Sequence, residues 1–326
     1  SKVKSLIGDK PIIHGLEHCS SFNQTEAILA VAGMLNTGTN LMYSLLRANC
    51  NIFSSIYIDK RGFAERRVRW QVNWGKHELP KFRYTHDIAK DFNYDIDDII
   101  PVVTTRDPYS WMQSMCRSPY VAGWFYTNRH CPNLILTRED RDAHARFTKW
   151  IRKNKRLKKA GIKPNPYTYT EGEPRILGGM GKYGAPIPTN ETVPLTMHFH
   201  SVNMTFTTIA DLWNTFYREY NTDSHPSLFV RAEDLIFFPR EVTTSICQCA
   251  GGKIYDTNDF NYVSESLKPG VKDNRHSLVN LLIRYGSAEA RTTQMTVDDL
   301  AYAKYSLDND LMDFYGYRHP DVVAGL

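Results

Sequence analysis

The sequence has no long hydrophobic run. Among its 326 residues, the longest apolar stretch covers only residues 28–35, and even that stretch includes Gly33. A membrane-spanning helix needs about 20 predominantly apolar residues, so we expect no membrane span in this chain. There is no internal repeat either, and hydrophobic residues make up an ordinary 42% of the chain. This composition excludes a wholly disordered, a collagen-like and a coiled-coil protein.

Cysteine is also scarce. The six cysteines stand at positions 19, 50, 116, 131, 247 and 249, which is far below the density of a small disulfide-held domain. We therefore expect mostly buried thiols. The Cys247-x-Cys249 pair lacks the two-residue spacing that is typical of a zinc knuckle, so we expect no metal.

Charge is modest overall but unevenly distributed. The net charge is +5, yet residues 141–159 contain nine basic residues and one acid, a local net charge of +8. The rest of the chain therefore carries −3. A nucleic-acid-binding protein usually spreads Lys and Arg over a wider surface, so we expect no nucleic-acid partner. The basic segment is either a solvated helix face or a surface that attracts an anion.

Short apolar segments alternate with helical patterns along the chain. Buried strands are predicted at residues 27–32, 99–104 and 227–231, because each is a short apolar run that ends in a polar turn. A helix is predicted after each strand, and further helices at residues 139–160, 200–220 and 297–315. This alternation predicts an α/β fold with a central parallel sheet flanked by helices. Residues 161–194 contain six Gly and six Pro, which indicates a loop.

The turn after the first strand is the most informative segment. It reads Ala32-Gly-Met-Leu-Asn-Thr-Gly-Thr-Asn-Leu41, and a glycine turn that opens a helix points backbone N–H groups at an anion. Gly33 and Gly38 have the spacing of a nucleotide P-loop, but Thr39 and Asn40 replace its Lys and Ser/Thr. Because that Lys neutralises phosphates and that hydroxyl binds Mg²⁺, the replacement disfavours ATP or GTP hydrolysis. It favours a ligand that needs no metal.

A second candidate anion site follows the strand at residues 99–104. Arg106 stands at the carboxyl end of this strand, where open α/β sheets bind ligands. Ser114 follows eight residues later, about two helical turns on. A guanidinium and a hydroxyl on one face suit a phosphate. A lone Arg at a strand end is more often held in a salt bridge, but two such sites on neighbouring βα units favour binding.

Together, these motifs resemble the cofactor site of the sulfotransferases that depend on 3′-phosphoadenosine-5′-phosphosulfate (PAPS). In that family a Ser-Gly-Thr-Thr type loop holds the 5′-phosphosulfate, and Thr37-Gly-Thr-Asn40 resembles it. An Arg and a Ser eight residues apart hold the 3′-phosphate there, as Arg106 and Ser114 are spaced here. The segments Val230-Arg-Ala-Glu-Asp-Leu235 and 307–317 also resemble family landmarks.

The resemblance implies a P-loop three-layer α/β sandwich. It implies one domain over residues 1–326, with an insertion at about 125–200 that covers the acceptor site. PAPS would be the sulfuryl donor and PAP the product, with no metal. The late basic loop of the family is matched only loosely by Lys268-Pro-Gly-Val-Lys272. The implied cofactor-binding residues are Asn36, Thr37, Gly38, Thr39, Asn40, Arg106, Ser114, Lys268 and Gly270.

The catalytic segment departs from the family in one respect. The family loop usually carries a Lys where this chain has Asn36. Residues 74–80, Trp-Gly-Lys-His-Glu-Leu-Pro, resemble the family's Lys-x-His-x-Pro segment, so we expect Lys76 to replace the missing cation. We expect His77 to be the base that takes the acceptor proton, because an unperturbed His titrates near neutral pH. The alternative bases are Glu65 and His86.

The expected reaction is sulfuryl transfer from PAPS to a hydroxyl or amine of a small-molecule or carbohydrate acceptor. One alternative is a non-catalytic P-loop-like domain whose basic helix binds a polyanion, and the other is a P-loop kinase. The chain begins with Ser rather than Met, so we expect it to be processed or truncated. Sequons at Asn23, Asn190 and Asn203 matter only in the secretory pathway. The cytosol and the Golgi lumen both stay open.

Overall fold

The computed structural model describes residues 7–58, 62–86, 88, 95–163, 166–177, 191–200, 202–255, 259–263 and 289–320. The chain divides into two compact units. The first unit contains Ser1–Trp111, Asn214–Arg291 and Asp308–Pro320, and the second contains Met112–Trp213, Thr292–Leu307 and Asp321–Leu326. In the described part of the chain, no helix combines the length and the apolar character needed to span a bilayer.

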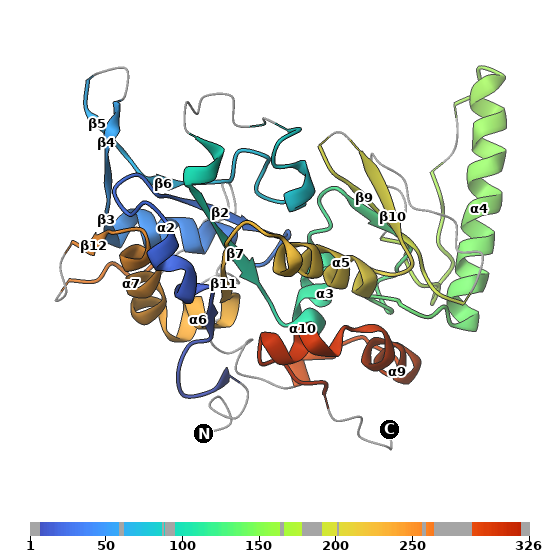
Figure 1. Cartoon of the computed structure of the whole chain (residues 1–326). Helices are drawn as coiled ribbons and strands as arrows, with labels where there is room; N and C mark the ends of the chain where they lie inside the picture. The colour runs from blue at the N-terminus through green and yellow to red at the C-terminus, as the bar shows by residue number, and fades with distance from the viewer. Residues whose placement is uncertain are drawn as a thin grey trace. The chain divides into compact units, whose positions relative to one another are not determined.

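A five-stranded mixed sheet forms the centre of the first unit (Figure 1). Strands β11, β7, β2 and β6 are parallel, and the short β1 pairs antiparallel with β11 at one edge. The sheet is therefore mixed, because β1 is antiparallel, but it is mostly parallel, as the sequence predicted. Every residue of β2, β7 and β11 is buried, which explains their continuous apolar sequences. The strands in sheet order are β1 (Ile13–His14), β11 (Leu228–Arg231), β7 (Ile99–Thr105), β2 (Ile28–Gly33) and β6 (Val68–Arg69).

Helices pack against this sheet around one hydrophobic core. Leu45 and Leu46 of α2 and Val242 and Ile246 of α7 are fully buried in it. Two disulfides link α7 to earlier parts of the chain in this region, Cys19–Cys249 and Cys50–Cys247. Among the described residues, the helices that belong wholly to this unit are α2 (Thr39–Asn49), α6 (Ala232–Phe237), α7 (Pro239–Cys249) and α10 (Asn309–Phe314).

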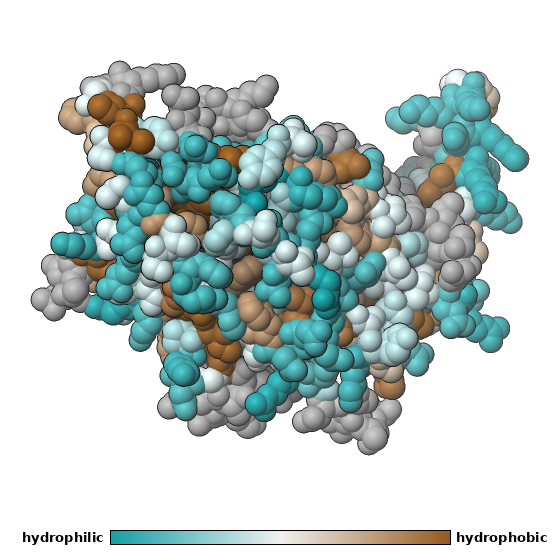
Figure 2. All heavy atoms as spheres, viewed as in Figure 1, coloured by the Kyte–Doolittle hydropathy of each residue, from teal (hydrophilic) through white to brown (hydrophobic). Residues whose placement is uncertain are grey.

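Short elements complete the first unit. The hairpin of β4 and β5 exposes apolar side chains, including Ile56 and Ile58, which are 61% and 63% exposed (Figure 2). The short strands are β3 (Cys50–Asn51), β4 (Phe53–Ile58), β5 (Ala64–Arg66) and β12 (Lys253–Ile254). The 3-10 turns are η1 (Leu16–Ser21), η2 (Pro80–Phe82), η3 (Ile96–Asp98) and η5 (Glu289–Arg291).

The second unit contains a three-stranded antiparallel sheet and a long basic helix. The sheet order is β10-β9-β8, and a disulfide joins Cys116 to Cys131. Two helices, α3 and α5, begin in one unit and end in the other. The elements are α3 (Pro108–Arg117), β8 (Ala122–Trp124), α4 (Arg138–Lys159), β9 (Leu195–His198), β10 (Asn203–Phe206), α5 (Ile209–Thr222) and α9 (Val297–Ser306).

Three sequence-based expectations are wrong. All six cysteines form disulfides, so none is a free thiol. The helix expected at 200–220 begins only at Ile209, because residues 203–206 pair with β9 as strand β10. The helix expected at 297–315 is broken in two, because the Asp308 carboxylate caps α10 by accepting a hydrogen bond from the Leu311 amide.

Candidate active site

The strand order creates a switch point between β2 and β7. The chain runs from β2 to β6 on one side of β2 and then crosses to β7 on the other side. Open α/β sheets bind ligands outside the carboxyl ends of their strands at such a point. The two loops that leave this edge carry the two anion-binding motifs expected from the sequence. The candidate site therefore comprises these two loops and the side chains that contact them.

The β2–α2 loop needs its two glycines. Gly33 has φ 140°, and a Cβ there would lie 2.5 Å from the Thr104 carbonyl oxygen on β7. Gly38 has φ 85° and forms the N-cap of α2. Asn36 adopts φ 64°, a left-handed conformation that Asn tolerates better than most residues. These values let the loop reverse direction tightly between the strand and the helix.

Internal hydrogen bonds fix the loop. The Thr37 hydroxyl donates to the Met34 carbonyl at 2.7 Å and lies 3.0 Å from the Thr104 hydroxyl. The Trp111 indole N–H donates to the Leu35 carbonyl at 2.8 Å. Thr37 is fully buried, so its hydroxyl holds the loop in shape. The loop is therefore preorganised before any ligand binds.

The first turn of α2 faces the end of this loop. The Gly38 cap has no side-chain oxygen with which to accept from the N–H groups of the first turn, and this turn contains no acidic residue. A helix N-terminus carries partial positive charge on such N–H groups. Thr39 is buried and Asn40 is partly exposed in this turn. The arrangement suits an anion.

Lys76 brings a buried cation to this helix turn. Its Nζ donates to the Asn40 Oδ1 at 2.7 Å and lies 3.5 Å from the centre of the Trp70 ring. The Trp70 indole N–H donates to the same Asn40 oxygen at 3.2 Å. Lys76 is only 3% exposed, and burial lowers its pKa to about 7. Its contacts are an amide oxygen and an aromatic face, both uncharged, so a bound anion would stabilise the ammonium.

His77 is tied to the loop from the other side. Its Nδ1 lies 2.6 Å from the Gly33 carbonyl oxygen. Because a carbonyl oxygen only accepts, Nδ1 carries the proton and Nε2 keeps its lone pair. Burial, and then the nearby Lys76 charge, lower the pKa of His77 to about 4. The imidazole is therefore neutral at pH 7 and has the tautomer that a base needs.

Arg106 follows β7 directly at the same edge. It is 4% exposed, and its Nη1 donates to the Asn36 carbonyl oxygen at 3.4 Å. Its neighbour Asp107 is held in a two-bond ion pair with Arg291 at 2.6 and 3.1 Å. Burial opposes ionisation of Asp107, but Arg291 prevails and the pKa of Asp107 is lowered. Arg106 therefore contacts the β2–α2 loop, while a different Arg neutralises the neighbouring acid.

The other predicted residues are placed as follows. Ser114 lies on α3 in the second unit, where it accepts a hydrogen bond from Arg117 at 2.8 Å. Glu65 on β5 pairs with Arg69 at 2.8 Å. The His86 ring stacks on Phe82, with ring centres 4.3 Å apart. Lys268 and Gly270 lie outside the described residues.

The segment from Val230 to Leu235 has a structural role. Arg231 forms two hydrogen bonds of 2.7 Å to the Asp234 carboxylate and one to the Ile7 carbonyl. The Arg231 side chain is only 2% exposed. Glu233 accepts from the Asp107 amide at 3.1 Å, and burial raises its pKa. These bonds anchor the carboxyl end of β11 beside that of β7.

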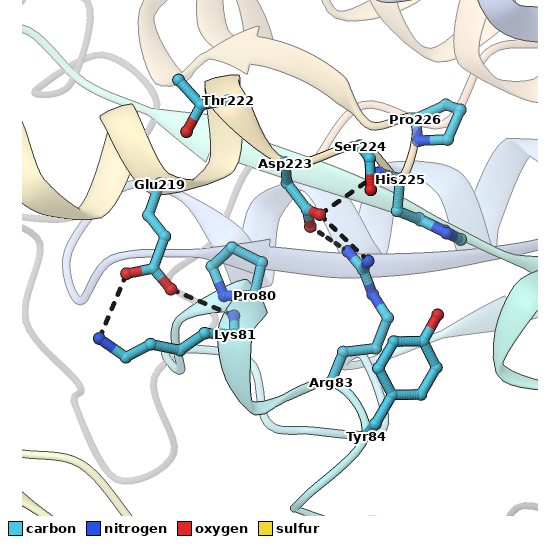
Figure 3. Close-up of a pocket in the computed structure, with 10 residues that line it drawn as sticks. All are labelled: Pro80, Lys81, Arg83, Tyr84, Glu219, Thr222, Asp223, Ser224, His225 and Pro226. Carbon is cyan, nitrogen blue, oxygen red and sulfur yellow. Dashed lines mark hydrogen bonds and ion pairs between the residues drawn. The ribbon is translucent and has the colours of Figure 1, made fainter.

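A pocket of about 470 Å³ lies elsewhere in the first unit (Figure 3). Its charged side chains face one another as the ion pairs Arg83–Asp223 and Lys81–Glu219. His225 in its lining donates from Nε2 to the carbonyl of Ile99, the first residue of β7. The pocket thus lies at the amino ends of the strands, opposite the switch point. We do not place the candidate site there.

The second unit contains a buried histidine between two carboxylates. His130 Nδ1 donates to Asp140 at 2.6 Å and Nε2 donates to Asp299 at 2.5 Å. Both aspartates also complete capping boxes, with Thr137 at the start of α4 and Thr296 at the start of α9. Burial opposes the charge on His130, but the two carboxylates raise its pKa to about 9. This cluster holds two helix starts together.

Two residues of these sites were not expected from the sequence. Trp70 follows β6, which is too short to be predicted, and it covers Lys76. His130 meets Asp299 across 169 positions of sequence, a distance that no local pattern reveals. The capping boxes Thr137-x-x-Asp140 and Thr296-x-x-Asp299 were the available signal.

Comparison of the chain with models of protein families, with curated proteins and with solved structures finds no match. Within the described ranges, no group of three or more His, Cys, Asp or Glu side chains is arranged to hold a metal ion.

Proposed function

We propose that this protein is a PAPS-dependent sulfotransferase with a P-loop fold. It transfers a sulfuryl group to a hydroxyl or amine of a small-molecule or carbohydrate acceptor. The main support is the buried Lys76, whose ammonium contacts uncharged groups beside the uncapped start of α2. A buried cation and a helix N-terminus at one place favour a ligand with a concentrated negative charge.

Each end of the donor has proposed partners in the first unit. The N–H groups at the start of α2, with Thr39 and Asn40, hold the 5′-phosphosulfate. Arg106 holds the 3′-phosphate, which is consistent with its position at the end of β7 and its contact with the Asn36 carbonyl. Thr37 contributes through its backbone, since its hydroxyl is bonded within the loop. The role expected for Ser114 stays a prediction.

Lys76 and His77 carry the proposed chemistry. PAPS supplies the sulfuryl group and leaves as PAP. His77 Nε2 takes the acceptor proton as the acceptor oxygen bonds to sulfur. Lys76 stabilises the negative charge that develops on the phosphate oxygen as its bond to sulfur breaks. A bound anion raises the pKa of both groups, which brings His77 from about 4 towards the range in which a base is effective.

The disulfides support a compartment for this reaction. All six cysteines are paired, and such bonds persist in oxidising environments. We therefore extend the proposal to the lumen of the secretory pathway. The proposed compartment does not alter the proposed chemistry of the site.

Ligand binding tests the proposal without knowledge of the acceptor. PAP at about 100 times its Kd should stabilise the folded protein by about 2.7 kcal/mol, which raises the melting temperature by several degrees. ATP with Mg²⁺ should do much less. Stabilisation by ATP with Mg²⁺ and none by PAP would overturn the sulfotransferase assignment in favour of a kinase.

Proton uptake tests the site itself. At pH 8 most Lys76 side chains are neutral, because the pKa is about 7. Binding of PAP should charge Lys76 and so take up protons, which calorimetry in buffers of different ionisation enthalpy measures. Lys76→Met should abolish this uptake and weaken PAP binding about 10- to 100-fold. Lys81→Met is the matched control, since Lys81 pairs with Glu219 at the other end of the strands.

A further inference from the structure

Helix α4 carries charge that the candidate active site does not use. The helix has 22 residues, of which only Asp140, Ala143 and Phe147 are buried. No acidic residue occurs between Asp142 and Glu171. On the face in view, hydrophilic side chains cover α4 at the upper right of Figure 2.

Five of these basic residues form one stripe. At 100° per residue, they fall within an arc of about 120° and extend over about 15 Å of helix. All five are exposed. Among the described residues, the ion pairs of α4 involve Glu139, Asp140 and Arg146, and none involves the stripe. The basic stripe consists of Lys149, Arg152, Lys153, Arg156 and Lys159.

The opposite face holds the helix in place. Phe147 packs edge-on against Tyr167 at 5.1 Å, and Trp150 does so at 5.5 Å. Arg146, which lies beside Lys149 and Lys153 at the edge of the stripe, forms an ion pair with Glu173 at 3.1 Å. These ring contacts anchor the middle of α4 on the side away from the stripe, and most of the stripe lies in the second half of the helix.

The stripe also carries unrelieved repulsion. Lys149 and Lys153 are four residues apart, as are Arg152 and Arg156, and like-charged pairs at this spacing destabilise a helix. The helix dipole favours the basic residues of the last turn, but Lys149 and Lys153 lie before that turn. A linear polyanion along the stripe would relieve this repulsion.

We propose that the basic stripe of α4 binds an anionic polysaccharide, one that bears sulfate or uronate groups. The three disulfides favour an oxidising compartment, where such chains are the common linear polyanions. Proteins that bind single-stranded nucleic acid interleave aromatic side chains with the basic ones, but Phe147, Trp150 and Tyr167 stack on one another.

A lipid surface fits α4 less well. A helix that binds membranes inserts an apolar face between the lipids, whereas Ala143 and Phe147 of α4 are buried within the protein. Anionic lipids also concentrate in the cytoplasmic leaflet, away from an oxidising compartment. The polysaccharide site goes beyond the proposed sulfuryl transfer, and it does not depend on it.

The test measures binding of heparin, without PAPS, by the folded chain of 326 residues. Lys149→Gln/Lys153→Gln removes two charges from the stripe. Lys155→Gln/Lys158→Gln removes two from the same helix outside the stripe and is the matched control. The stripe variant should bind about 10-fold more weakly near 0.15 M salt and reduce the slope of log affinity against log salt by about 2. The control should retain most of the affinity.

Three results would overturn the proposal. The first is no binding of heparin by the wild-type chain at this salt concentration. The second is an equal loss in both double variants, which would mean that only the total charge matters. The third is tighter binding to duplex DNA or to phosphatidylserine vesicles than to heparin. Because PAP binding is measured separately, failure here leaves the sulfotransferase proposal unaffected.

Discussion

Two histidines of this chain lie in opposite electrostatic environments. His77 in the first unit lies beside Lys76, and burial with that charge lowers its pKa to about 4. His130 in the second unit lies between Asp140 and Asp299, which raise its pKa to about 9. Each is tied to the protein by hydrogen bonds of 2.5–2.6 Å. The two sites differ in the charges near each imidazole. His130 is bonded to two carboxylates, whereas the ammonium near His77 contacts only the uncharged Asn40 and Trp70 among the described residues.

This contrast distinguishes the candidate binding site from a structural cluster. Around His130 the imidazolium forms ion pairs with Asp140 and Asp299. Both aspartates also cap helices. Around His77 the nearby charge is Lys76, whose own contacts are uncharged. Groups that keep an unfavourable protonation state within a fold are candidates for function. The first arrangement stabilises the fold, and the second is suited to a ligand.

The largest expected effect is on turnover, with His77→Asn. The Asn amide can still donate to the Gly33 carbonyl as Nδ1 does, but it has no basic nitrogen. Sulfate transfer from labelled PAPS to a phenol or an oligosaccharide should fall about 10²- to 10⁴-fold, while PAP binding is unchanged. Normal turnover would remove His77 from the mechanism and direct attention to Glu65 or His86. Loss of PAP binding would instead indicate a structural role.

The next effect is on stability, with the same substitution at each histidine. His130→Ala leaves Asp140 and Asp299 buried without their cation, which should cost about 3–5 kcal/mol. His77→Ala removes one hydrogen bond and should cost about 1–2 kcal/mol. Chemical denaturation followed by circular dichroism measures both. Equal losses at the two positions would contradict the contrast drawn between them.

The sequence predicts secondary-structure elements better than it predicts which elements pair with one another. The strands β2, β7 and β11 and helix α4 were expected within two residues, because each strand is a continuous apolar run and the helix has clear helix signals. The short strands β6, β8 and β9 were missed, since two to four residues carry little periodicity. Strand β10 was mistaken for part of a helix, because its pairing with β9 is not a local property.

The same limit applies to the candidate site. The β2–α2 loop and Arg106 were recognised because each motif is contiguous or lies at a strand end. The disulfides were missed because their cysteines are up to 230 residues apart. The contact between Lys76 and Asn40 spans 36 positions, so the sequence predicted Lys76 as the replacement cation only through the family resemblance. Burial sets its pKa, and burial is a property of the folded chain.

A smaller effect appears in the pH dependence of stability. The folded pKa of His130, about 9, lies above the unfolded value of 6.5. Its contribution, on the order of 3 kcal/mol, is therefore complete below pH 6.5 and is lost as the pH rises to 9. His77 has the opposite sign, because its folded pKa of about 4 is below 6.5. Its burial as a neutral group destabilises the fold as the pH falls from 6.5 to 4.

Melting temperatures across this range separate the two histidines. The difference between wild type and His130→Ala should shrink between pH 6.5 and 9. The difference between wild type and His77→Asn should change between pH 4 and 6.5 instead. A His130→Ala difference that stays constant to pH 9 would show that this imidazole is neutral in the folded protein.

The smallest effect comes from the helix caps that share the His130 carboxylates. The Thr137 hydroxyl donates to Asp140 at 2.6 Å and accepts from its amide at 3.1 Å, so Thr137→Ala should cost about 1 kcal/mol. Because Asp140 also accepts from His130, this cost should change by at least about 0.5 kcal/mol in the His130→Ala background. Thr208→Ala, which removes an acceptor for the Asp211 amide on α5, should cost the same in both backgrounds. Additive effects at Thr137 would mean that the ion pair and the cap act independently, and that His130 stabilises α4 only through charge.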